Sequence, residues 1–393
     1  MINNKLMLGF DDLAMMGCVQ SSITSRKECI TTLSDGMLPI FASPMPSVID
    51  ENNYKKFIEN KINVVIPRTV NFETRLSLIN EVFVAVGIDE FKRMFINDDC
   101  LIKETNSKMY VCIDIANGHM SYLHNLILTA KLKFKKDLVI MMGNLMNPLL
   151  YPKLAEIGVD YVRVSVGTGS ICTTSVVSGV HATIPYIMEG LMSAKKDVVA
   201  EYKRINNTKK DVDPYLYEVT IGDTVIKVPI ETLDKFDLKT TDKKKQTSEI
   251  TPDIYTVPKI IVDGGINSFD KINKSLALGA DYVMLGGMLA KTEEACGDIV
   301  DNEDGRFHVY YGMSTHRAQK QCGIKDEDLR PEEGITKLVK IEYRLKDLVG
   351  KIDFYLKEAM SLTDSRTLDD FKSGNIPFYP ISSSAFNNYT ADK

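Results

Sequence analysis

The chain contains 393 residues, of which 44% are hydrophobic, and it carries 48 Lys and Arg against 53 Asp and Glu. This length and apolar content can build a sizeable core, as one large α/β domain or two smaller ones. The mildly acidic balance excludes the basic footprint of a nucleic-acid-binding protein, and no apolar stretch reaches the roughly 20 residues of a membrane helix. The seven cysteines are scattered and never spaced as C-x-x-C, which is typical of reduced thiols and predicts a cytoplasmic protein.

Eight short runs rich in β-branched residues follow one another along the chain, most of them with a helix-like segment behind. They are LPIFAS (38–43), NVVIP (63–67), VFVAV (82–86), MYVCID (109–114), LVIMMG (138–143), YVRVSV (161–166), KIIVDGG (259–265) and DYVMLGG (281–287). Strands that alternate with helices form parallel sheets, and eight such units favour a closed (β/α)8 TIM barrel over an open doubly wound sheet. The double glycines that end the last two runs support the barrel, because its loops after strands seven and eight often bind phosphate.

Residues 193–257 interrupt this alternation with a segment rich in Lys, Asp and Thr. Its centre, YEVTIGDTVIKVPI, predicts a β-hairpin with strands at 218–221 and 224–228 and a turn at Gly222 and Asp223. The segment lies between the sixth helix and the seventh strand of the predicted barrel, so we expect it on the face opposite the active site. We therefore predict one barrel domain over 1–393, with 193–257 as a solvated insertion or a subunit contact.

The stretch VSVGTGSICTT at 164–174 carries a cysteine just beyond the carboxyl end of the sixth predicted strand. Active sites of (β/α)8 barrels assemble at that end of the strands. Gly167 and Gly169 permit a tight loop, and a thiolate at Cys172 would be a strong nucleophile beside a suitable base. Single cysteines are more often small buried core residues, so the glycine loop, Ser170 and the strand-end position carry the catalytic interpretation.

The segment GTGSICTT closely resembles the catalytic loop shared by IMP dehydrogenase and GMP reductase, and other motifs of that family occur in the family's order. They are GFDDL (9–13), DIANGH (114–119), MGN (142–144), VDGG (262–265), YVMLGGMLAKTEE (282–294), YYGMS (310–314) and RPEEG (330–334). The resemblance covers most of the chain outside 193–257 and the extreme C-terminus. It favours the reductase branch, because no CBS regulatory domains follow the second strand and the short segment from Gly312 to Glu333 lacks the Arg-Tyr flap motif of dehydrogenases.

The reductase resemblance implies NADPH-dependent reductive deamination of GMP, or of a related guanine nucleotide, to IMP and ammonia. Cys172 matches the nucleophile that forms a thioimidate at C2 of the purine, and Thr174 and Glu333 match the pair that handles protons as ammonia leaves. Positions that match the binding site of this purine nucleoside monophosphate are Ser170, Asp263, Gly265, Gly286, Gly287, Tyr311, Gly312, Met313 and Ser314. Positions that match the cofactor site are Asp114, Asn117 and Arg330, and the carbonyls of Gly167, Gly169 and Cys172 match a potassium loop. The family also implies a homotetramer.

Several family positions differ in this chain. Pro46 stands where an aspartate is expected near the substrate, and Ser175 replaces the arginine beside the potassium loop. His181 and Ala182 replace residues of the usual GVGYPQ, and Arg68 remains from a basic pair near the cofactor. A shifted substrate, such as a deoxynucleotide or a modified purine nucleotide, therefore stays open. Two other functions also stay open: an IMP dehydrogenase-like oxidation of IMP to XMP with NAD, and an inactive purine-nucleotide-binding paralogue.

Overall fold

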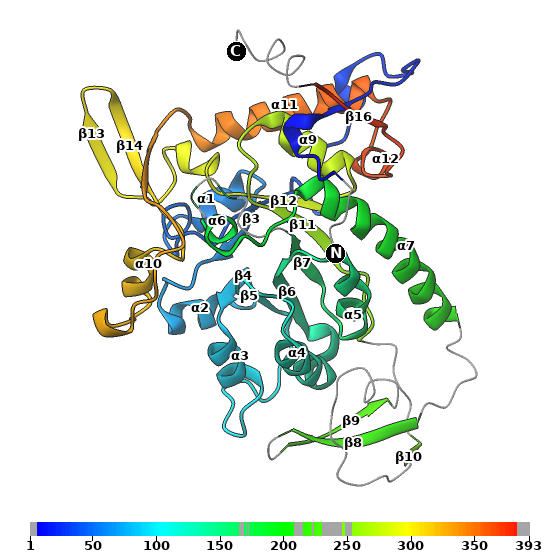
Figure 1. Cartoon of the computed structure of the whole chain (residues 1–393), viewed down its shortest axis with the longest axis vertical. Coiled ribbons are helices and arrows are strands. Elements are labelled where there is room, and N and C mark those ends of the chain that lie inside the picture. The colour runs from blue at the N-terminus through cyan, green and yellow to red at the C-terminus, as the bar shows by residue number, and fades with distance from the viewer. Residues whose placement is uncertain are drawn as a thin grey trace.

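Eight parallel strands close into a barrel in the computed structural model, which describes residues 6–164, 169, 171, 173–207, 215–221, 224–229, 246–247 and 254–382 (Figure 1). In barrel order the strands are β11 (Lys259–Asp263), β12 (Tyr282–Leu285), β2 (Ile40–Ala42), β3 (Asn63–Ile66), β4 (Phe83–Val86), β5 (Met109–Asp114), β6 (Leu138–Leu145) and β7 (Tyr161–Val164). Each of the eight predicted runs contributes one strand. The (β/α)8 barrel is therefore confirmed, and the open sheet is excluded.

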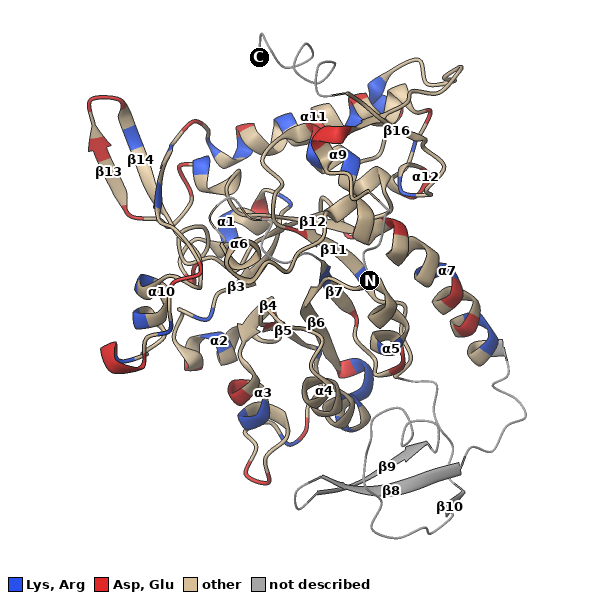
Figure 2. Cartoon of the chain, viewed as in Figure 1, with Lys and Arg blue, Asp and Glu red and all other residues tan. Residues whose placement is uncertain are grey.

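Helices surround the barrel on the outside (Figure 1). They are α1 (Tyr54–Glu59), α2 (Phe72–Leu78), α3 (Ile88–Phe95), α4 (Ser121–Phe134), α5 (Tyr151–Glu156), α7 (Ile184–Asn207), α9 (Phe269–Ala277) and α11 (Leu345–Leu362). The last of these buries Leu345, Leu348, Ile352 and Leu356, whose spacing of three or four places them on one face of the helix. Lys and Arg are interspersed with Asp and Glu along the outer helices in Figure 2. No helix among the described residues is long and apolar enough to cross a membrane.

Two aspartates tie the amino ends of neighbouring strands together. Asp160, just before β7, accepts a 2.8 Å hydrogen bond from a backbone N–H of β6 and a 2.9 Å bond from the Lys131 ammonium of α4. Asp281, just before β12, accepts the same pair of contacts from a backbone N–H of β11 at 2.8 Å and from Lys195 of α7 at 2.7 Å. Each carboxylate thus joins two strands and one helix, which fixes the register of the sheet at this end.

Aromatic rings fill the amino-terminal part of the barrel interior. Phe41, Phe83, Tyr161 and Tyr282 pack against one another with ring centroids 5.0 to 6.2 Å apart. The Lys259 ammonium lies 5.6 Å from the ring centroids of both Tyr161 and Tyr282, close enough for a cation–π contact. We call the rings of Phe41, Phe83, Tyr161 and Tyr282 the aromatic plug. Because the plug occupies this end, a ligand can reach the barrel interior only from the carboxyl ends of the strands.

Two small sheets outside the barrel were not expected from the sequence. The strands β13 (Ile299–Asn302), β14 (Gly305–Tyr310) and β15 (Lys337–Lys340) form an antiparallel sheet, and β13 and β14 project from the barrel as a hairpin (Figure 1). The strands β1 (Leu13–Met15) and β16 (Phe378–Pro380) pair antiparallel and bring the two ends of the described chain together. The helix α10 (His316–Gln321) connects β14 to the segment that carries Glu333.

The inserted segment contains the predicted hairpin. The strand β8 (Tyr215–Ile221) pairs antiparallel with β9 (Thr224–Pro229), and β10 (Gln246–Thr247) pairs with β8. The predicted turn at Gly222 and Asp223 lies outside the described residues. In chain order the hairpin lies between α7 and β11, the sixth barrel helix and the seventh barrel strand, as predicted. Because α7 runs to Asn207, residues 193–207 of the predicted insertion belong instead to the barrel helix.

Candidate active site

Acidic residues and paired glycines gather at the carboxyl ends of the barrel strands. Asp114 is the last residue of β5, and Asp263 is the last residue of β11. Gly264 and Gly265 follow Asp263 with φ angles of 93° and 74°, a left-handed conformation that glycine adopts without steric cost. Gly286 and Gly287 directly follow β12 in the chain. The barrel therefore brings two glycine loops and two carboxylates, all of them predicted site positions except Gly264, to one face.

Thr174 and Glu333 meet beside the cysteine loop. Thr174 begins α6 (Thr174–Ser178), and its hydroxyl donates a 2.7 Å hydrogen bond to Oε2 of Glu333. The two segments are also joined through their backbones. The Thr173 N–H donates to the Glu333 carbonyl at 2.9 Å, and the Ile335 N–H donates to the Ile171 carbonyl at 2.9 Å. The fold thus unites the predicted acid–base pair across two distant parts of the chain.

Three predicted site residues of the loop, Gly167, Ser170 and Cys172, lie outside the described residues. Cys172 is flanked in sequence by Ile171 and Thr173, and both neighbours bond the segment that carries Glu333. Of the three predicted potassium ligands, the structure describes Gly169 alone. In the described part of the chain, no cluster of three or more His, Cys, Asp or Glu side chains could hold a metal ion. The nucleophile and the potassium loop therefore stay predictions.

The loop between β14 and α10 lies against the cysteine loop. A Cβ atom on Gly312 would lie 3.4 Å from Cδ1 of Ile171, and Met313 and Ser314 follow it. The loop is held by Thr315, whose hydroxyl donates to the Gly312 carbonyl at 2.9 Å and accepts from the first turn of α10. This contact places the predicted base-binding positions beside Ile171, the residue that precedes Cys172 in the sequence.

The two tyrosines of the YYGMS motif point to different places. Tyr311, a predicted phosphate ligand, is buried, and its hydroxyl hydrogen-bonds the Gln321 side chain at 3.2 Å. The Tyr310 hydroxyl instead lies beside the glycine loop, 2.8 Å from the position that a Cβ atom on Gly286 would occupy, and it donates to Met45 Sδ at 3.4 Å. Burial raises the pKa of Tyr310, so this hydroxyl keeps its proton and can donate it. Tyr310 was missed from the sequence, where only its place in the motif pointed to it.

The three predicted cofactor residues, Asp114, Asn117 and Arg330, are not joined to one another as Thr174 and Glu333 are. Asn117 and Arg330 are both exposed, and the backbone of Arg330 is held by the Gln319 side chain at 2.9 and 3.1 Å. Asp114 is instead engaged by Arg163 of β7, whose Nη1 donates to its Oδ1 at 2.5 Å. Among the described residues, no hydrogen bond or ion pair joins Arg330 to Asp114 or Asn117. Their common role stays a prediction.

Arg163 occupies the centre of the barrel mouth and was also missed. It is 6% exposed, and its Nε and Nη2 both donate to Oδ2 of Asp263, at 3.1 and 2.8 Å. Burial alone would lower the pKa of Arg163, but the charges of Asp263 and Asp114 hold it above its usual range. Arg163 therefore stays a cation and links a predicted ribose ligand to a predicted cofactor ligand. Its signal in the sequence was a charged residue inside the apolar run YVRVSV.

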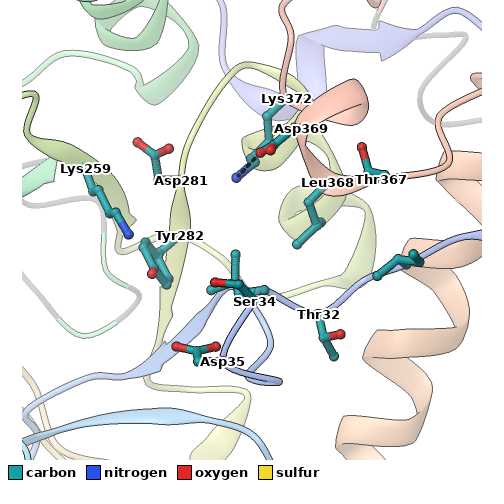
Figure 3. Close-up of a pocket in the computed structure, with 12 residues that line it drawn as sticks. Thr32, Ser34, Asp35, Lys259, Asp281, Tyr282, Thr367, Leu368, Asp369 and Lys372 are labelled. Carbon is teal, nitrogen blue, oxygen red and sulfur yellow. Dashed lines mark ion pairs between the residues drawn. The ribbon is translucent and has the colours of Figure 1, made fainter.

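A polar hollow of about 420 Å³ lies at the opposite end of the barrel (Figure 3). Lys259, Asp281 and Thr367 border it, with an ion pair of 3.6 Å between Lys372 and Asp369 at one side. No predicted site residue lines this hollow, and the aromatic plug separates it from the carboxyl ends of the strands. The candidate active site is therefore the face of the barrel that carries Arg163 and the glycine loops.

A protein-family model described as the IMP dehydrogenase / GMP reductase domain matches residues 8–201 and 248–391. The residues between the two matched parts fall within the predicted insertion.

Curated relatives carry the names of both enzymes. A GMP reductase of Buchnera aphidicola subsp. Acyrthosiphon pisum (strain Tuc7) is 24% identical over 332 residues, which cover 82% of this chain and 75% of the relative. A GMP reductase of Aliivibrio fischeri (strain MJ11) is 24% identical over 373 residues, covering 89% of each chain. An inosine-5'-monophosphate dehydrogenase of Chlorobaculum tepidum is 28% identical over 283 residues, covering 70% of this chain and 45% of the relative. The chain therefore belongs to the IMP dehydrogenase / GMP reductase family of oxidoreductase enzymes.

Proposed function

We propose that this enzyme catalyses the NADPH-dependent reductive deamination of GMP, or of a related guanine nucleotide, to IMP and ammonia. The observation that carries the proposal is the 2.7 Å hydrogen bond from the Thr174 hydroxyl to the Glu333 carboxylate, two positions along the chain from Cys172. A carboxylate bonded to a hydroxyl can withdraw and return a proton through that hydroxyl. The pair is therefore suited to protonate an amino group as it leaves the purine.

In this proposal the Cys172 thiolate adds to C2 of the purine. The Thr174–Glu333 pair delivers a proton to the amino group at C2, which leaves as ammonia, and the purine stays bound to sulfur as a thioimidate. A nicotinamide dinucleotide held by Asp114, Asn117 and Arg330 would supply the hydride that C2 accepts. The sulfur then leaves as a thiolate and the product is IMP, so each GMP converted oxidises one NADPH to NADP⁺.

The groups at the carboxyl ends of the strands suit these two ligands. Gly265, Gly286 and Gly287 can donate hydrogen bonds from their backbone N–H groups to a phosphate, and the Asp263 carboxylate can accept hydrogen bonds from ribose hydroxyls. Asp114, Asn117 and Arg330 offer a carboxylate, an amide and a guanidinium, which fit the hydroxyls and phosphates of a dinucleotide.

Four finer assignments belong to the same proposal and rest on the family. They are a single barrel domain with an insertion at 193–257 and no CBS regulatory domains, a homotetramer, a potassium ion held by the carbonyls of Gly167, Gly169 and Cys172, and a cytoplasmic location. The six described cysteines are all free thiols, which supports a reducing compartment.

An IMP dehydrogenase-like oxidation is the second candidate, because the Chlorobaculum tepidum relative carries that name. The segment from Gly312 to Glu333 argues for the reductase. It is short and folds into α10 and one 3-10 turn (Asp326–Asp328), with Gln319 bonding the backbone of Arg330. Of the two activities, only the dehydrogenase must hydrolyse its covalent intermediate, for which its longer flap activates water.

The test is the absorbance of NADPH in a mixture of the purified full chain, NADPH and GMP. We expect the absorbance to fall, and we expect Cys172→Ala to abolish the change. Turnover with a deoxynucleotide or a modified purine nucleotide but not with GMP would shift the substrate. Reduction of NAD with IMP would establish the dehydrogenase, and inactivity with every nucleotide would leave a binding protein.

A further inference from the structure

The guanidinium of Arg163 holds one oxygen of each carboxylate at the barrel mouth. Nε and Nη2 donate hydrogen bonds to Oδ2 of Asp263, and Nη1 donates a hydrogen bond to Oδ1 of Asp114. Among the described residues, the remaining oxygen of each carboxylate makes no hydrogen bond. Both carboxylates can therefore accept hydrogen bonds from a ligand while the guanidinium fixes their orientation.

Packing leaves Arg163 little freedom to move away from this position. A Cβ atom on Gly143 of β6 would lie 2.6 Å from the Arg163 Cβ, so the neighbouring strand approaches it at a distance that glycine alone allows. On the β5 side, Nη1 lies 3.6 Å from the Cys112 sulfur. The arginine thus contacts three other strands, β5, β6 and β11, of which β5 and β11 carry candidate site residues.

Among the described residues, Arg163 is the cation that forms ion pairs with both carboxylates. Burial raises the pKa of Cys112 to about 12, and it also raises the pKa of Tyr310, so both of these neighbours are uncharged near neutral pH. Burial likewise raises the pKa of Cys322, which follows α10 in the chain, although the charge of Arg68 opposes this shift. Arg68 itself is engaged with the Glu90 carboxylate at 3.8 Å.

We propose that Arg163 is a positioning residue that sets the nucleotide site at Asp263 and the dinucleotide site at Asp114 in one fixed arrangement. The inference rests on the proposed function, because it takes the two carboxylates as ligands of the two substrates. A guanidinium suits this task since its planar fork can hold two carboxylates in defined directions, whereas an ammonium acts as a single point charge.

Two substitutions separate charge from geometry. Arg163→Met leaves two partly buried carboxylates without their counter-ion, which favours protonation of one of them at low pH, and a protonated carboxyl is a poorer acceptor. Its KM values for GMP and NADPH are therefore expected to rise together, and to rise further at low pH. Arg163→Lys keeps the charge but loses the fork, so both KM values rise without a new dependence on pH.

The experiment measures kcat and KM for both substrates at about pH 6, 7 and 8 in the wild type, Arg163→Met and Arg163→Lys. We expect both KM values of Arg163→Met to rise at least about tenfold at neutral pH, since hydrogen bonds to charged groups are the strong ones. Lys131→Met is the matched control, because it removes a buried cation from the Asp160 carboxylate at the other end of the barrel. It should lower stability and leave both KM values unchanged.

The outcomes distinguish the two levels of the proposal. A wild type that does not oxidise NADPH with GMP overturns the proposed function. In an active wild-type background, Arg163 variants that change the KM of one substrate only, or an Arg163→Met variant with the same pH profile as the wild type, overturn the positioning role. If Arg163→Met does not fold, Arg163→Lys decides, because unchanged KM values in that variant contradict the need for a fork.

Discussion

Thr174 and Glu333 are expected to act as one unit, and a double-mutant cycle tests this directly. Thr174→Val removes the hydroxyl and Glu333→Gln removes the charge from the 2.7 Å hydrogen bond. A hydrogen bond to a charged group contributes roughly 1.5 to 3 kcal/mol, which corresponds to about 10- to 150-fold in rate. Loss of proton transfer raises the expected decrease in kcat to about 10²- to 10⁴-fold for each single variant. Because the two groups share one task, the double variant should be no more than about threefold slower than the slower single variant.

The assay is NADPH oxidation at saturating GMP, with the purified full chain. Thr173→Val is the control, because Thr173 precedes α6, makes no side-chain cap and contacts Glu333 through its backbone. Its kcat should stay within about twofold of the wild type, as for most substitutions that remove no described contact. Multiplying effects in the double variant, or a Thr174→Val enzyme with the kcat of the wild type, would refute a shared proton path.

Three further perturbations follow from the same structure. Gly286→Ala would place Cβ 2.7 Å from Met45 Sδ and 2.8 Å from the Tyr310 hydroxyl. We expect this overpacking to lower the free energy of unfolding by about 1–3 kcal/mol, measured by denaturant unfolding, and to raise the KM for GMP. An unchanged KM would remove the glycine loop from the nucleotide site. Burial would raise the pKa of Glu90, but hydrogen bonds from Arg75 and a backbone N–H lower the pKa overall. The ionised Glu90 carboxylate therefore stabilises the folded state above the unfolded pKa of about 4.3, and this stabilisation is lost as the pH falls through the lowered folded-state pKa. Glu90→Gln should thus be less stable than the wild type at about pH 7, the difference should shrink as the pH falls below the unfolded pKa, and a constant difference contradicts this. Exchange of potassium for lithium should lower kcat, and equal rates in both salts would exclude the proposed cation loop.

The barrel could be predicted from the sequence because its strands obey a local rule. Each buried parallel strand reads as a short apolar run, and eight such runs separated by helical segments leave few alternatives. The sheet of β13, β14 and β15 has no such signal. All four residues of β13 are exposed, so no apolar alternation marks it, and its turn reads as an ordinary polar loop. The pairing of β1 with β16 joins three-residue strands from opposite ends of the chain, which no local pattern can show.

Site residues that belong to a family motif could be proposed from the sequence, whereas the contacts of Arg163 form only when the barrel closes. Its partners lie 49 and 100 positions away along the chain, at the ends of β5 and β11. A single arginine in an apolar strand does indicate a paired buried charge, because an unpaired one would be too costly. The identity of the partners follows from neither propensity nor spacing, since it depends on which strands flank β7 and which side chains point inward. Asp114 and Asp263 were proposed as ligands because each belongs to a family motif. Both carboxylates bind the Arg163 guanidinium, so the two proposed ligand sites share one arrangement. A substitution at Arg163 is therefore expected to change the KM of both substrates, although neither DIANGH, which contains Asp114, nor VDGG, which contains Asp263, includes this arginine.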